Sequence, residues 1–228
     1  MLVDDGSTDE TPICLAELAQ GSLYRVLRHE TNLGIAAARN TGVRQSQGQG
    51  ISFCDADDCF LETHLFQVLG VLNRPVTHPD PNLQRCGDYP AAVKTRVRIQ
   101  DILHPEWQRR VEWSIPLNLC LRREVHAFLG GFPEENAFRE CSYGTEDSAY
   151  SQWLHQFFQV VTLPIATVEH FRYPGNHLDK QLARFQHPPG AYRESVCDRD
   201  RQLLADIDGI IEVRSQRLRD KSQFPSQT

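Results

Sequence analysis

Residues 51–58 read Ile-Ser-Phe-Cys-Asp-Ala-Asp-Asp, a short apolar run that ends in three carboxylates. The apolar part is long enough for a buried strand, and a strand of an open α/β sheet presents the residues that follow it at the carboxyl edge, where such sheets bind ligands. Asp55 and Asp57 alternate along an extended backbone and therefore point to the same side. Carboxylates this close repel one another unless a cation lies among them, so the pattern predicts a site for one hard divalent cation and an oxygen-bearing ligand.

Two other interpretations of these acids fit less well. A calcium-binding EF-hand loop that begins at Asp55 requires Gly and Glu at the positions of Phe60 and Phe66. A phosphoaspartyl phosphatase motif requires Thr or Val at the position of Cys59. A phosphotransfer enzyme that uses Asp55 as its nucleophile is therefore the poorer alternative.

The composition predicts an ordinary soluble globular protein. The chain has 228 residues, 40% hydrophobic residues and a formal net charge of −6, which argues against a nucleic-acid partner. No apolar run is long enough to cross a bilayer, and no signal-peptide pattern opens the sequence. The seven cysteines form no Cys-x-x-Cys pair, which favours reduced thiols and a cytoplasmic location, with the inner face of a membrane as an alternative.

Strands and helices alternate through the first half of the sequence, which predicts a βαβαβ order and a mostly parallel sheet. Strands are expected at residues 1–3, 23–27, 51–54, 93–99, 117–121 and 160–168. Helices are expected at residues 10–20, 35–43, 60–72, 123–129, 145–158 and 203–218, with an irregular one at 102–113. Residues 73–90 and much of 174–200 are expected to form loops.

Three further features carry candidate functional residues or contacts. The turn after the first strand contains Asp4 and Asp5. Glu146 and Asp147 lie in the first turn of the helix predicted at 145–158, where Thr145 is the expected N-cap and acids favour the helix dipole. The helix predicted at 203–218 either packs against the domain or mediates self-association, and Lys94, Arg96 and Arg98 are expected on the outer face of their strand.

The order of four motifs resembles family 2 glycosyltransferases, which have the GT-A fold. These motifs are Val3-Asp4-Asp5-Gly6-Ser7-Thr8-Asp9, Asn32-Leu33-Gly34 with Ala38-Arg39-Asn40-Thr41-Gly42, the acids of residues 50–58, and Gly130-Gly131-Phe132-Pro133-Glu134 followed by Glu146-Asp147. The resemblance covers residues 1–172 and implies an inverting, metal-dependent hexosyltransferase. Its donor would be a nucleoside diphosphate sugar, most often UDP-linked, and its acceptor a saccharide or a lipid-linked hydroxyl.

The resemblance also implies roles for individual residues. Nucleotide-sugar binding would fall to Asp4, Asp5, Arg39 and Asp55, with Asp4 on the base and Asp55 near the ribose. Asp57, with His170, would bind Mg²⁺ or Mn²⁺ bridging the two phosphates. Asp147 would be the general base for the acceptor hydroxyl, supported by Glu146.

The resemblance further predicts how the chain is divided. A GT-A domain is expected at residues 1–172, a loop and helical extension at 173–218, and a disordered tail at 219–228. The family's first strand should precede Val3, which predicts that the sequence starts inside a longer reading frame. An inactive remnant that binds nucleotide sugars without turnover is the alternative function.

Overall fold

The strand predicted ahead of the acids is present as β3 (Gly50–Ser52), at the edge of its sheet. The structure is a computed structural model that describes residues 1–21, 23–191 and 196–223. It belongs to a five-stranded sheet of order β3-β6-β5-β7-β4. The other members are β4 (Asp58–Phe60), β5 (Ala92–Ile99), β6 (Leu119–Arg122) and β7 (Val160–His170). A separate two-stranded sheet pairs β1 (Leu2–Asp4) with β2 (Val26–Arg28).

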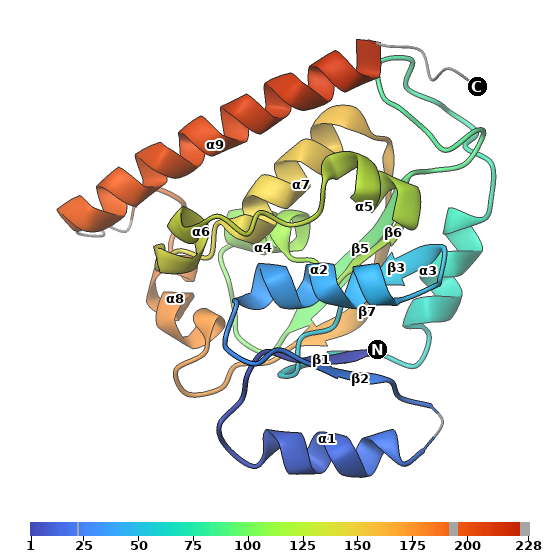
Figure 1. The fold of residues 1–228 in the computed structure, drawn as a ribbon. Helices are drawn as coiled ribbons and strands as arrows, with labels where there is room; N and C mark the ends of the chain where they lie inside the picture. The colour runs from blue at the N-terminus through green and yellow to red at the C-terminus, as the bar shows by residue number, and fades with distance from the viewer. Residues whose placement is uncertain (22, 192–195, 224–228) are drawn as a thin grey trace.

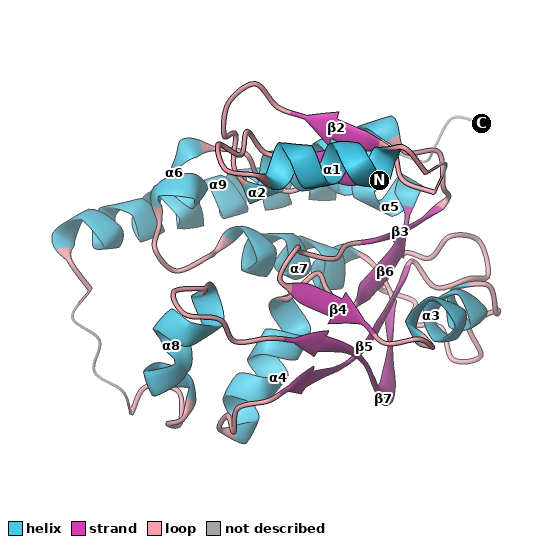
Figure 2. Cartoon of the chain, turned by 90° about the horizontal axis from the view of Figure 1, so that it is seen from below, coloured by secondary structure: helices cyan, strands magenta, loops and turns pink. Residues whose placement is uncertain are grey.

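Helices cover these sheets on several sides. They are α1 (Thr11–Ala19), α2 (Ile35–Gln45), α3 (His64–Leu72), α4 (Pro105–Ser114), α5 (Arg123–Leu129), α6 (Asn136–Glu140), α7 (Glu146–Phe157), α8 (His177–Phe185) and α9 (Asp198–Gln223). In Figure 1, α1 and the β1–β2 pair lie at one end of the molecule and α9 crosses the opposite end. Figure 2 shows α3 on one side of the five-stranded sheet, with α4 and α8 on the other.

The strand directions correct the expectation of a mostly parallel sheet. The pairs β1–β2 and β5–β7 are parallel, whereas β3–β6, β5–β6 and β4–β7 are antiparallel. A connection that contains a helix can return the chain in either direction, so the alternation of strands and helices did not determine how β6 and β4 pair. The short strand β4, which the sequence pattern did not reveal, owes its existence to this pairing with β7.

The core lies between the sheet and helices α5, α7 and α9. As predicted, α7 buries one apolar face, and its inward residues are Ala149, Tyr150, Trp153, Leu154 and Phe157. Phe132 stacks on Tyr150 with ring centroids 4.1 Å apart. Large buried rings of this kind dominate core energetics, so they fix how α7 lies against the sheet.

Helix α9 packs into this same core, which is one of the two alternatives predicted for it. Ile207 and Leu218 are buried in the main hydrophobic cluster. The Arg214 guanidinium lies over the Trp153 ring at 4.1 Å, and its Nε donates to the carbonyl of Leu129. The predicted tail at 219–228 is helical as far as residue 223, and residues 224–228 lie outside the described residues.

Candidate active site

The side chain of Arg39, on the buried face of α2, joins two acids from distant parts of the sequence. Its Nη2 donates to Asp55 Oδ2 at 2.7 Å, and its Nη1 donates to Asp147 Oδ1 at 2.5 Å. The guanidinium also lies over the Phe132 ring, 5.2 Å from its centroid. Arg39, Asp55 and Asp147, which the sequence assigned to the donor side and to the base, therefore form one cluster.

Asp147 is placed by the start of α7 and has an unusual charge environment. Its side chain is 21% exposed. Burial raises the pKa of Asp147 to about 7; Arg39 opposes this shift, and the charges of Glu146 and Asp55 add to it. Thr145 occupies the N-cap position as predicted, but its hydroxyl makes no capping bond. A carboxyl group that titrates near neutrality can accept a proton from a substrate hydroxyl.

Asp57 and Asp58 face the chain that follows β7. Asp57 is exposed and accepts a hydrogen bond from Asn176 Nδ2 at 3.3 Å. The side chain of Asp58 is nearly fully buried, and its Oδ1 accepts from His170 Nδ1 at 2.7 Å and from the Phe171 amide at 3.3 Å. The antiparallel β4–β7 register places Asp58 directly opposite His170. The three acids that follow β3 thus contact different partners: Asp55 contacts Arg39, Asp57 contacts Asn176, and Asp58 contacts His170.

The contact between His170 and Asp58 bears on metal binding. A histidine that ligates a metal usually donates its other ring N–H to a carboxylate, as His170 Nδ1 does to Asp58. Burial opposes protonation of His170, but the hydrogen bond that it donates to Asp58 and the charges of Asp58, Asp57 and Asp55 raise its pKa. The free Nε2 of His170 therefore lies in a field set by the acids of this loop.

The donor set fits a divalent cation that is shared with a substrate. Among the described residues, no three His, Cys, Asp or Glu side chains are gathered into a complete metal cage. Mg²⁺ is commonly held by one or two carboxylates, several waters and substrate phosphates, so it needs no such cage. The exposed carboxylate of Asp57 and the Nε2 of His170 are the groups that would hold it.

The turn after β1 holds Asp4 in a largely buried position. Asp4 is 4% exposed, and its Oδ1 accepts from the Ser7 amide at 2.9 Å. The hydrogen bonds from Ser7, together with the charge of Arg28, lower the pKa of Asp4. Its Oδ2 lies 3.5 Å from Arg28 Nη1 and has no hydrogen-bond partner among the described residues. This Oδ2 atom is an unsatisfied acceptor, but it is itself buried.

Asp5 is used within the fold. Its Oδ1 accepts from His29 Nδ1 at 2.7 Å and from the Leu33 amide at 2.9 Å, and its Oδ2 accepts from the Gly34 amide at 2.7 Å. His29 Nε2 lies 3.0 Å from Thr41 Oγ1 on α2. Asp5 therefore ties the first acidic turn to the helix that carries Arg39.

Asn40, next to Arg39, is a structural residue to which sequence reasoning gave no role. Its Nδ2 donates to the Phe132 carbonyl at 2.9 Å and to Glu134 Oε1 at 2.6 Å, and its Oδ1 accepts from the Phe132 amide at 2.8 Å. Gly131 has a φ of +81°, and a Cβ there would lie 2.6 Å from Asn40 Oδ1. The only signal in the sequence was that Asn40 and Gly131 belong to two of the four motifs.

Lys94 corrects another expectation, because it is buried rather than on the outer face of β5. It is 2% exposed, and its Nζ donates to the carbonyls of Trp113 at 2.5 Å and Ile115 at 3.1 Å. Burial lowers the pKa of Lys94 to about 7, although the charges of Asp147 and Glu112 oppose this shift. The carbonyls at the end of α4 need a donor, and the alternation of residues along the strand could not reveal that need. Arg96 and Arg98 are exposed, as predicted.

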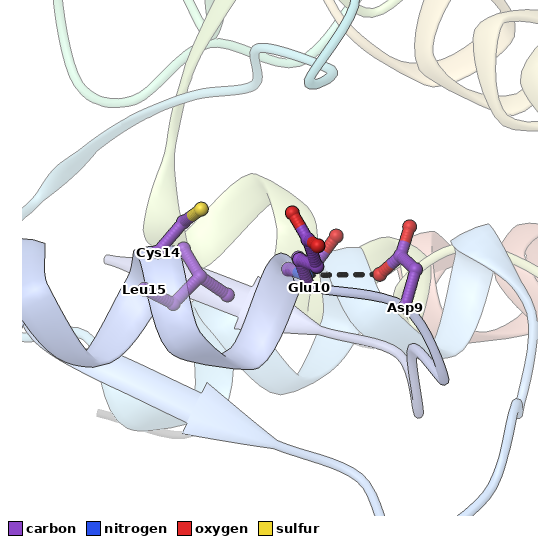
Figure 3. Close-up of a pocket in the computed structure, with 5 residues that line it drawn as sticks. Asp9, Glu10, Cys14 and Leu15 are labelled. Carbon is purple, nitrogen blue, oxygen red and sulfur yellow. Dashed lines mark hydrogen bonds between the residues drawn. The ribbon is translucent and has the colours of Figure 1, made fainter.

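A surface hollow lies at the start of α1, apart from these acids. Figure 3 shows it between Asp9, Glu10, Cys14 and Leu15, with the Thr11 amide donating to Asp9 Oδ1 at 3.0 Å. None of the residues that line this hollow belongs to the predicted site.

Comparison with protein families and curated proteins gives consistent results. The sequence profile described as "Glycosyl transferase family 2" matches residues 1–120. An uncharacterized glycosyltransferase of Haemophilus influenzae is 36% identical over 74 residues, which is 32% of this chain and 24% of that protein. Glycosyltransferase GlyG of Streptococcus pneumoniae is 43% identical over 63 residues, which is 27% of this chain and 21% of that protein. The matched segment thus spans about a quarter of these relatives.

Solved structures show the same fold. The TarS fragment 1–349 of S. aureus in complex with UDP-GlcNAc matches with a TM-score of 0.61 and 16% identity, over 93% of this chain and 56% of that one. The mannosyltransferase PcManGT of Pyrobaculum calidifontis, in complex with GDP-Man and Mn²⁺, matches with a TM-score of 0.54 and 17% identity, over 95% of this chain and 63% of that one. Within the part of the chain that the structure describes, no helix is both long and apolar enough to span a bilayer.

Proposed function

The chain belongs to glycosyl transferase family 2 and has the GT-A fold, and from this we propose that it transfers a sugar from a nucleoside diphosphate sugar to an acceptor hydroxyl, with inversion at the anomeric carbon. The observation that carries the proposal is the contact of Arg39 with both Asp55 and Asp147. It gives one site a donor-side acid and a partly buried acid suited to act as a base. All residues with a proposed role lie within the domain expected at residues 1–172.

On the donor side, Asp4 would accept a hydrogen bond from the base through its unpartnered Oδ2, which is buried and would be uncovered by opening of the turn. Asp55 would lie near the ribose, and Arg39 and Asp5 would support the nucleotide indirectly through their contacts within the fold. We propose UDP as the nucleotide, in line with the UDP-GlcNAc complex of TarS. The GDP-Man complex of PcManGT makes GDP the alternative to test.

Asp57 and the Nε2 of His170 would hold Mg²⁺ or Mn²⁺, and Mn²⁺ accompanies GDP-Man in PcManGT. A divalent cation at this position supplies charge neutralisation for the leaving diphosphate. Asp58 would keep the imidazole of His170 in the orientation that leaves Nε2 free.

On the acceptor side, Asp147 would take the proton from the attacking hydroxyl. A base of this kind contributes about 10²–10⁴-fold to the rate. Glu146 would act on Asp147 through its negative charge, which helps to raise the pKa of Asp147. The proposed acceptor is a hydroxyl of a saccharide or of a lipid-linked glycan. The seven free cysteines suit a cytoplasmic setting.

A thermal-shift panel of nucleotide sugars, with and without Mn²⁺, tests the donor side of this proposal. The expected result is a metal-dependent rise in Tm for one base and sugar, because a specific ligand stabilises the folded state by mass action. The D57N variant should lose the metal dependence, whereas D88N, a change at an exposed acid, should keep it. If no nucleotide sugar shifts the Tm with metal present, the proposal is wrong.

Release of the nucleoside diphosphate in the presence of candidate acceptors separates an enzyme from a binding protein. Metal-dependent binding without release under any condition would support the inactive alternative. Release that follows the acceptor concentration would support transfer.

A further inference from the structure

Arg39 is a buried cation with two separate anionic partners. Its side chain is 6% exposed, and its Nε has no hydrogen-bond partner among the described residues. Both terminal nitrogens are engaged, one by Asp55 in the loop after β3 and the other by Asp147 on α7. Two carboxylates around one guanidinium leave a net negative charge in a partly buried site, which is unstable unless the pairs are well formed.

We propose that Arg39 is a positioning residue that holds the donor-side acid Asp55 and the base Asp147 in one bridge, so that a single guanidinium aligns the two halves of the reaction. This inference rests on the proposed function for the roles of the two acids. It gives Arg39 a role other than direct nucleotide contact.

The groups around Asp147 single out Arg39 as its structural partner. The charged groups that act on Asp147 are Arg39 on α2, Glu146 on α7, Asp55 in the loop after β3 and Lys94 on β5. Two of these are negative and repel Asp147. The ammonium of Lys94 is already used by the carbonyls of Trp113 and Ile115.

The helix that carries Arg39 is itself held in place. Asn40 is bonded to the backbone of Phe132, and Thr41 lies 3.0 Å from His29 Nε2, which in turn contacts Asp5. The Phe132 ring also lies against the guanidinium. These contacts hold Arg39 in place independently of the two acids, so Arg39 can fix the positions of both carboxylates.

The shape of arginine is what the bridge requires. Its planar fork presents two nitrogens in different directions, whereas a lysine ammonium is a single point charge on a long stem. R39K therefore keeps the charge but is not expected to hold both carboxylates at once. R39Q removes the charge as well.

Kinetics of R39K test the positioning role. We expect the kcat of R39K to fall by about 100-fold, because a lysine cannot hold both carboxylates at once. In R39Q, which also lacks the charge, the acidic limb of the pH profile should move up by about one unit, because Asp147 loses the cation that favours its ionised form. The Kd of UDP with Mn²⁺ should rise, since Asp55 loses its anchor. The matched control is R44K, on the same helix but exposed, which should leave all three quantities unchanged. A kcat of R39K within a few-fold of the parent, or an unshifted pH profile in R39Q, would overturn the proposal.

A double-mutant cycle in urea unfolding tests the bridge without any substrate. It compares the parent with R39Q, D147N and R39Q/D147N. If R39Q does not fold, R39K takes its place in both the single and the double variant. If the two substitutions acted independently, the factors by which they change the folded-to-unfolded ratio would multiply in the double variant. We expect the ratio of the double variant to be about tenfold higher than that product, as for residues in direct contact. Effects that multiply to within about twofold would refute the contact.

The two tests distinguish failure of the bridge from failure of the proposed function. If the cycle shows coupling between Arg39 and Asp147 but the protein turns over no donor, the bridge is supported and the proposed function is rejected. Turnover with an uncoupled cycle and an unshifted pH profile would retain the function and reject the bridge.

Discussion

The acidic turns after β1 and after β3 have similar sequences but are held in different ways. In the first, Asp4 accepts from the Ser7 amide of its own turn, whereas Asp5 accepts from His29 and from the amides of Leu33 and Gly34, which follow β2. In the second, Asp55 and Asp58 contact Arg39 on α2 and His170 on β7. The first turn is held mostly by backbone amides within residues 4–34, whereas the second is held by side chains from α2 and from the far end of β7.

This difference teaches where substitutions should act. Carboxylates that are tied mainly to backbone amides contribute to the stability of the fold. Carboxylates held by distant side chains depend on several elements being in register, and they are the ones that can contact substrate, metal and base together. We therefore expect loss of stability from changes at the first turn and loss of function from changes around the second.

The largest effect is expected from D147N. Without a carboxylate to take the proton, transfer should fall by about 10²–10⁴-fold, while the affinity for UDP and Mn²⁺ changes by only a few-fold. Initial rates and nucleotide titration measure the two quantities, and D198N, at an acid that is 96% exposed, is the control. Transfer at the parent rate would remove Asp147 from the role of base.

A smaller effect is expected from D58N, which should weaken Mn²⁺ binding by about 10–100-fold because His170 loses the carboxylate that orients it. The measurement is Mn²⁺ binding in the presence of UDP, followed by electron paramagnetic resonance or calorimetry. D88N serves again as the control for a surface acid. An unchanged affinity for Mn²⁺ would mean that the contact between Asp58 and His170 is purely structural.

D5N should act on stability instead, lowering the free energy of unfolding by about 1–2 kcal/mol at neutral pH. Partial burial opposes ionisation of Asp5, but hydrogen bonds from His29, Leu33 and Gly34 lower its pKa overall. A lowered folded-state pKa gives stability that is present above the unfolded pKa of about 3.9 and is lost as the pH falls through the folded value. Urea unfolding at pH 7 and below pH 3 should therefore show a difference between parent and variant that shrinks in acid.

The smallest effect is expected from R44A. Arg44 is exposed on α2, and its Nη1 lies 3.6 Å from Glu134 Oε1, a distance typical of a surface ion pair. Such pairs contribute about 0–1 kcal/mol. Urea unfolding and nucleotide titration should both match the parent closely, and a large loss in either would mean that α2 is held differently from the way described above.

Local patterns in the sequence predicted the helices whose ends and buried faces are determined by their own residues. Helix α5 has the predicted bounds, because Gly130 ends it with a φ of +81°. Helix α7 differs from the prediction by about a residue at each end, since its apolar face and first-turn acids are both visible in the sequence. The acids after β3 were placed correctly because they directly follow an apolar run.

The features that the sequence did not reveal depend on pairings between distant segments. The contact between Asp58 and His170 requires β4 to pair antiparallel with β7. The burial of Lys94 requires the end of α4 to lie over β5. Arg39 was expected at the nucleotide, but its bonds to Asp55 and Asp147 depend on how α2 lies relative to the loop after β3 and to the start of α7, which no local pattern encodes.

Helix α7 links the chemistry to the interior in a way that constrains how this protein can evolve. Asp147 lies at its first turn, and Trp153 and Phe157 further along are buried in the core. A helix behaves as a stiff rod, so a change in volume beneath Trp153 would displace the carboxylate at its far end. Interior replacements that a purely structural helix would tolerate should therefore be under selection here through their effect on turnover.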